Sequence, residues 1–149
     1  MQRPRHLLLA LALTIGAAGC DEKLSTLAGP TPDLEPNFAS IQRNIFETTD
    51  VAGRLACTNC HTNVGRTPAA GLNLLSSVAY DQLVNTSSTQ RQGVPRVIPG
   101  DPEGSYLMHK VEGRSGIVGR RMPIAGPPYL TDGQILILRR WIEDGAPRN

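Results

Sequence analysis

The sequence has few of the residues from which a large core or a common reactive site is built. Aromatic residues make up only 4% of the 149 residues, so the apolar core of any domain here must be modest. There are three cysteines and three histidines. No paired carboxylates and no Ser, His and Asp set indicate catalysis. Composition alone therefore favours a small domain without a hydrolase-like site.

The chain also lacks an apolar run long enough for a confident membrane span. The apolar residues 7–13 follow Arg3 and Arg5 and precede small residues, which is the order of an export signal. Residues 17–20, Ala-Ala-Gly-Cys, resemble a bacterial lipobox, although leucine is more common at its first position. We expect residues 1–19 to be a lipoprotein signal and Cys20 to be lipidated. The alternative is an ordinary cleavable signal with an incidental cysteine.

Residues 20–36 are rich in proline and poor in large apolar side chains. They are predicted to be a tether between the lipid and one domain at residues 37–149. Two or more acyl chains, at ~0.8 kcal/mol for each buried CH₂, give stable attachment to a membrane. The predicted location is the bacterial cell envelope, on the periplasmic side. Asp21 resembles an inner-membrane retention signal, which favours the inner membrane over the outer.

What the sequence does contain is the pentapeptide Cys57-Thr58-Asn59-Cys60-His61. C-x-x-C-H is the spacing of covalent haem attachment. Two thiols one helical turn apart can each form a thioether with a haem vinyl group, and the adjacent imidazole can bind the iron. Cys57 and Cys60 are therefore predicted to hold one haem c, with His61 as the proximal ligand. With Cys20 lipidated, no cysteine is left over.

Two other interpretations of the cysteine pair are half of a zinc site and a dithiol redox pair. A zinc site needs about four ligands. Outside the motif the chain offers only Cys20, His6 and His109. A thioredoxin-like pair belongs to a βαβ unit, and no strand pattern flanks the motif. Haem attachment is the interpretation that the sequence favours.

The other side of the iron needs a second ligand or stays open. Met122 follows a glycine-rich stretch and precedes Pro123, where an extended chain can bring a thioether to the ring. Met108 and His109 are the other candidates, but both fall within an expected helix that would have to face the haem. We predict Met122 as the distal ligand, with Met108, His109 and an open position as alternatives.

Apolar spacing predicts a mainly α fold of short helices and loops. The first helix is expected over residues 37–49 with Asn37 as N-cap, and a short one over residues 77–84. Another is expected to begin with Asp101 as N-cap and Pro102 as its first helical residue. A loop over residues 62–75 should provide a backbone carbonyl, near Pro68, for the second nitrogen of His61.

The last helix is the best defined in the sequence. Thr131-x-x-Gln134 has the form of a capping box, and Gly145 suits the C-terminal cap. The expected apolar face consists of Ile135, Leu138, Trp141 and Ile142. About thirteen residues are marginal for an isolated helix, so this helix must be held by packing.

Five short motifs occur one after another along the chain. They are Cys57-Thr58-Asn59-Cys60-His61, Pro99-Gly100-Asp101-Pro102-x-x-Ser105-Tyr106-Leu107, Met122-Pro123, Leu130-Thr131-Asp132-Gly133-x-Ile135 and Trp141-Ile142-x-x-Gly145-Ala146. Over residues 55–147 this resembles the small class I-like c-type cytochrome domains, especially the planctomycete type. The polar residues 85–96 depart from that pattern. The resemblance implies a cytochrome c-like helical fold around one haem, with Cys57, Cys60, His61 and Met122 in the roles given above.

The expected function is a membrane-anchored single-haem carrier of electrons between redox proteins, and not an enzyme. Alternatives are an open-site haem enzyme or gas-binding protein, and an accessory haem subunit of a larger complex. Without Arg3 and Arg5, 13 of the 15 basic residues remain, against 13 acidic ones, so nucleic acid is not an expected partner. From Arg91 onward there are nine basic and six acidic residues, an excess that suits an acidic partner, the haem propionates, or a solvated surface. Since the haem would supply apolar contact, we expect the apoprotein to fold poorly.

Overall fold

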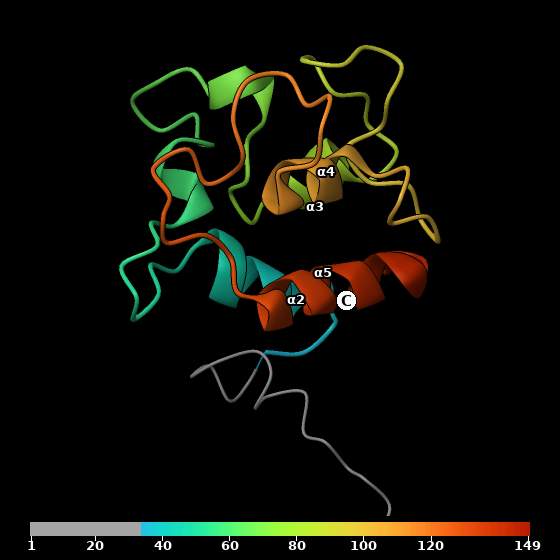
Figure 1. Ribbon diagram of the computed structural model, residues 1–149, viewed down its shortest axis with the longest axis horizontal. Coiled ribbons are helices and arrows are strands. Elements are labelled where there is room, and N and C mark those ends of the chain that lie inside the picture. Colours follow the sequence, from blue (N-terminus) through green and yellow to red (C-terminus); the bar gives the residue numbers. More distant parts are fainter. Residues whose placement is uncertain (1–33) are drawn as a thin grey trace, which may run out of the picture.

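The computed structural model of this chain describes residues 34–149 (Figure 1). The predicted signal at residues 1–19, Cys20 and the tether up to residue 33 lie outside the described residues. Leu34, at the end of the predicted tether, is 4% exposed and packs in the core. The packed domain therefore reaches back at least to residue 34.

Within residues 34–149 the chain forms a small, mainly helical domain with four α-helices and no sheet. The elements in order are α2 (Phe38–Ile41), the π-helix η1 (Gln42–Phe46), the 3₁₀ turns η2 (Cys57–Asn59) and η3 (Ala69–Gly71), α3 (Ala79–Leu83), α4 (Tyr106–Glu112) and α5 (Asp132–Glu143). None of the helices in this part of the chain is long and apolar enough to cross a membrane. The expected mainly α character is confirmed.

The first helix begins where the sequence predicts but ends earlier. Asn37 is its N-cap, and the Asn37 side chain accepts a hydrogen bond of 2.8 Å from the backbone N–H of Ser40. After Ile41 the helix continues as the π-helix η1, and the N–H of Glu47 bonds the carbonyl of Gln42 at the end. The helical residues therefore stop at Phe46 and not near residue 49.

The last helix, α5, confirms the predicted capping box. The Thr131 hydroxyl accepts from the N–H of Gln134, and the Gln134 side chain accepts from the N–H of Thr131. Gly145 follows the helix with a positive φ of 90°. The inner face differs from the prediction at one position, because Ile137 is fully buried and Ile135 only partly.

The predicted start of α4 is wrong. The Asp101 carboxylate accepts a hydrogen bond from the N–H of Gly104, which closes a turn over residues 101–104 instead of a helix. Ser105 is the residue at the N-cap position. Its hydroxyl donates to the carbonyl of Asp101 and accepts from the N–H of Ile98, so the turn is bonded on both sides.

Helices α2 and α5 contact each other in one layer, and α3 and α4 form the layer above (Figure 1). Buried residues of all four helices make up the core between these layers. The ring of Phe38 is 5.2 Å from that of Tyr80 and 5.5 Å from that of Trp141. The Trp141 indole donates to the carbonyl of Pro147, so its polar edge is satisfied within the core. Packing of α5 against α2 and α4 supplies the support that a helix of this length needs.

Candidate cofactor site

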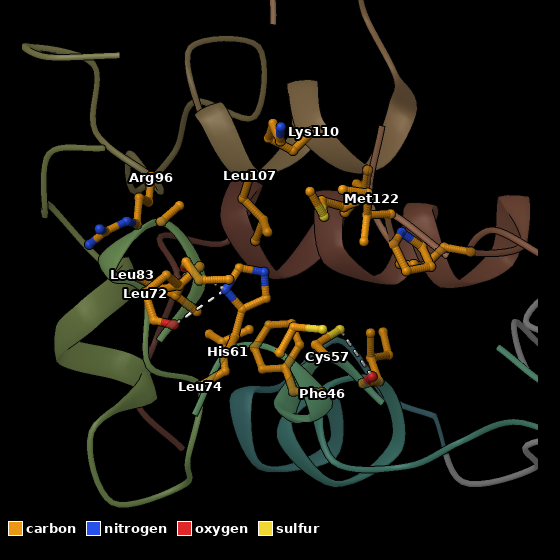
Figure 2. Close-up of a pocket in the computed structure, with 18 of the residues that line it drawn as sticks. Phe46, Cys57, His61, Leu72, Leu74, Leu83, Arg96, Leu107, Lys110 and Met122 are labelled. Atoms are coloured by element: carbon orange, nitrogen blue, oxygen red, sulfur yellow. Dashed lines mark hydrogen bonds between the residues drawn. The ribbon is translucent and has the colours of Figure 1, made fainter. Parts of the chain in front are cut away.

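A cavity of about 310 Å³ lies between η1, the turn η2, α4 and the segment around Met122. This volume is in the range of pockets for small molecules and cofactors. The walls are mainly apolar, and the side chains that line them include Ile45, Phe46, Leu72, Leu74, Leu83, Leu107, Val111, Leu130 and Leu138. Figure 2 shows these walls closing around His61.

The C-x-x-C-H residues form one tight turn at the cavity wall. The N–H groups of Cys60 and His61 both bond the carbonyl of Cys57, at 3.2 and 2.9 Å. Cys57 is half-buried and Cys60 exposed, neither is in a disulfide, and both line the cavity with His61. The two cysteines therefore lie on one turn at the cavity wall, with His61 directly after them.

Side chains of residues 54–58 bind this turn to the end of η1. Arg54 donates to the carbonyl of Ile45 at 3.3 Å, the Cys57 thiol donates to the same carbonyl, and the Thr58 hydroxyl donates to that of Phe46. Carbonyls at a helix C-terminus have no partner within the helix, so these bonds satisfy them. Burial raises the pKa of the Cys57 thiol, and the nearby Arg54 guanidinium opposes that rise.

His61 is oriented through its Nδ1 atom. This atom lies 3.0 Å from the carbonyl oxygen of Ala69 and 3.3 Å from that of Leu72. Because both partners are acceptors, the proton sits on Nδ1, and Nε2 keeps its lone pair. Burial lowers the pKa of His61, although the two carbonyl bonds oppose this. The loop does provide the expected carbonyl, immediately after Pro68.

The three candidates for the sixth iron position lie in different places. Met122 lines the cavity, and Figure 2 shows its thioether and the His61 ring pointing into the same space. Met108 is fully buried in the apolar core and does not line the cavity. His109 also lies outside it, with Nε2 bonded to the backbone carbonyl of Glu103. Of the three, only Met122 is brought together with His61.

The C-terminal end of α4 positions Met122. The Met122 N–H donates to the carbonyl of Lys110, and the Nε–H of Arg121 donates to that of Val111, both at 2.8 Å. The Arg121 guanidinium also lies 4.2 Å from the centre of the Tyr129 ring. The last carbonyls of α4 therefore fix the backbone that carries the thioether.

Two basic residues of the cavity wall, Arg96 and Lys110, are not predicted from the sequence. They are 6% and 7% exposed, and burial lowers the pKa of each. Helical spacing could have indicated that Lys110 faces inward, because it lies on the same helix face as Leu107 and Val111. Arg96, which ends the polar stretch 85–96, carries no comparable signal.

Residues 34–149 contain no group of three or more His, Cys, Asp or Glu side chains arranged to hold a metal ion. Compared with models of protein families, with curated proteins and with solved structures, the chain matches none.

Proposed function

We propose that this chain is a small c-type cytochrome that carries single electrons and has a cytochrome c-like fold around one covalently bound haem. The observation that carries the proposal is the convergence of the two thiols, the imidazole of His61 and the thioether of Met122 on one apolar cavity. Met122 comes from a segment far along the chain from the turn that carries the other three. Haem, when bound, supplies an iron centre that exchanges one electron between its ferric and ferrous forms.

The residues of the cavity fit such a group. Cys57 and Cys60 would hold the group through thioether bonds to its two vinyl substituents. His61 is held by two carbonyls through Nδ1, so Nε2 is available as a ligand. Met122 offers a neutral sulfur, a ligand that raises the reduction potential.

The attachment to a membrane is a proposal from the sequence alone, since Cys20 lies outside the described residues. A lipid on Cys20 would place the haem domain beside redox proteins of the cell envelope, with the inner membrane as the expected site. Cys20→Ser should release the protein into the soluble periplasmic fraction without changing its absorption spectrum. A variant that stays in the membrane fraction as wild type does would contradict the anchor.

The test of the proposed function is the absorption spectrum of the full chain from a bacterial host that matures c-type cytochromes. A covalent, low-spin haem with the weak long-wavelength band of methionine-ligated ferric iron is expected. A high-spin spectrum would favour an open-site enzyme or gas-binding protein. Absence of covalent haem would refute the proposal.

The role of Met122 is tested by Met122→Leu, which removes the sulfur and keeps an apolar side chain of similar volume. The reduced variant should bind carbon monoxide rapidly and lose the long-wavelength band. Met108→Leu is the matched control and should behave as wild type, because Met108 lies outside the cavity. If Met122→Leu keeps the wild-type spectrum and carbon monoxide binding, Met122 is not the ligand.

A further inference from the structure

Arg96 and Lys110 are buried cations of the cavity wall without an acidic partner. Neither forms an ion pair within residues 34–149, whereas the equally buried Arg54 pairs with Asp50 at 3.0 Å. A charge taken out of water is costly unless an opposite charge or good hydrogen bonds compensate it. The cavity between them therefore favours an anionic group.

The hydrogen bonds of the two cations leave donors for such a group. Arg96 donates to the carbonyls of Gln82 at 2.8 Å and Gly71 at 3.5 Å, and Lys110 donates to that of Val118 at 2.8 Å. A guanidinium has five N–H donors and an ammonium three, so both keep donors beyond these bonds. Carbonyl oxygens also carry no net charge, so the charge itself stays uncompensated.

The polar residues 85–96 bring further polar groups to the same cavity. This stretch is bonded as an irregular hairpin, in which the N–H of Ser88 donates to the carbonyl of Val94 and the N–H of Arg96 to that of Thr86. The Thr89 hydroxyl bonds the carbonyl of Ala70, which fastens the stretch to the loop that holds His61. Ser88, only 6% exposed, and Gln90 both line the cavity.

We propose that Arg96 and Lys110 form an anion subsite that binds the carboxylates of the molecule in this cavity, which Ser88 also lines. This rests on the proposed function for the identity of those carboxylates, which are the two propionates of haem. Figure 2 shows Arg96 and Lys110 away from Cys57. Haem bears its vinyl groups at one edge and its carboxylates at another, so the cations that bind the carboxylates should lie away from the cysteines. The stretch that departs from the cytochrome pattern thus has a binding role in this chain.

The electrostatic consequence is a measurable shift of reduction potential. Cations held in a wall of low dielectric favour the state with one more electron, because they attract the added negative charge. Removing one cation would also leave a carboxylate unpaired, and this favours the oxidised state. The lost attraction of the cation and the unpaired carboxylate both lower the potential of a variant without that cation.

The experiment is a redox titration of the haem-loaded full chain carrying Arg96→Gln or Lys110→Gln. Each variant should show a lower midpoint potential than wild type with an unchanged low-spin spectrum. Arg96→Lys keeps the positive charge and should stay close to the wild-type potential. Arg66→Gln is the matched control, since Arg66 is exposed, bonds the Asn59 carbonyl and does not line the cavity. Its potential should stay at the wild-type value.

Three results would overturn the inference. If both Gln variants hold covalent haem at the wild-type potential, the subsite does not exist, while the proposed function stands. If added phosphate at constant ionic strength shifts the wild-type potential as far as the substitutions do, a free anion and not a propionate fills the subsite. If wild type attaches no haem, the proposed function and the assignment to propionates fail together.

Discussion

Arg54 connects the turn of residues 57–61 to the helix before it. Its side chain is fully buried, and it donates to Asp50, Ile45, Leu55 and Thr48. The Asp50 carboxylate in turn accepts from the backbone N–H groups of Ala52 and Arg54, which fixes the loop between η1 and η2. The position of Cys57 therefore depends on one buried ion pair.

Arg54→Met should destabilise the protein strongly, because it leaves Asp50 and several carbonyls without a partner. Removing one member of a buried ion pair costs about 3–5 kcal/mol. Denaturant unfolding of the variant and of wild type, both haem-loaded, measures the difference. Arg148→Met is the control, since the Arg148–Asp81 pair is exposed and such pairs are worth about 0–1 kcal/mol. Equal midpoints for Arg54→Met and wild type would contradict this role.

The elements α4 and α5 are joined at the surface by a cluster of charges. Arg139 of α5 bonds Glu112 of α4 and Glu103 of the preceding turn, and Arg114 bonds the same two carboxylates. Gly113 ends α4 with a φ of 73°, and a Cβ there would meet the Arg121 side chain at 2.8 Å. This glycine lets the chain turn back toward Met122, while the ion pairs hold the two helices at their outer edge.

The ion-pair cluster should make stability fall on acidification. Hydrogen bonds from Arg114, and then Arg139, lower the pKa of Glu103 below its ordinary value of about 4.5. A carboxyl group whose pKa is lower in the folded state stabilises the protein above the unfolded value and loses this effect as the pH falls through the folded value. Glu103→Gln should therefore lose less stability than wild type below about pH 4.5.

Thermal unfolding between pH 3 and 7, about the range in which carboxyl groups titrate, measures this difference. Glu143→Gln is the control, because Glu143 is exposed at the end of α5 and outside the ion pairs of residues 34–149. Its pH profile should follow wild type. If Glu103→Gln also follows wild type, Glu103 does not contribute to the acid sensitivity.

At the scale of the whole molecule, one apolar core also provides much of the cavity wall, since Ile45, Phe46, Leu83, Val111 and Leu138 belong to both. Phe38, Tyr80 and Trp141 fill the space between α2 and α5, whereas η1, α4 and the Met122 segment surround the cavity. A domain this small buries a limited apolar area by itself. Under the proposed function, haem in the cavity would contribute much of the contact between its walls, and its binding to the folded state alone would add stability.

The haem-free protein should accordingly be much less stable than the haem-loaded one. Cys57→Ser/Cys60→Ser, which cannot form thioethers, should show less helical circular dichroism and a broader, lower thermal transition. Cys20→Ser is the control for loss of cysteine outside the haem site and should keep both haem and fold. Equal, cooperative unfolding of the double variant and wild type would show that the fold does not depend on the cofactor.

Local features of this protein were predictable from the sequence because they depend on groups within about one helical turn. The turn from Cys57 to His61, the cap at Asn37 and the capping box of Thr131 and Gln134 are all of this kind. Such bonds form between neighbours in the chain and change little with the surrounding fold. The wrong start of α4 is also a local matter, since Asp101 can close a turn as well as cap a helix.

The tertiary structure decided which distant side chains meet at the cavity. The sequence favours Met122 over Met108 and His109 as the distal ligand, but it is packing of the Met122 segment on the end of α4 that brings Met122 to the cavity and leaves the other two outside it. The burial of Arg54, Arg96 and Lys110 is likewise a result of packing between segments far apart in the chain. A spacing pattern records the side chains available along one segment, but the surface that each side chain faces depends on where the other segments pack.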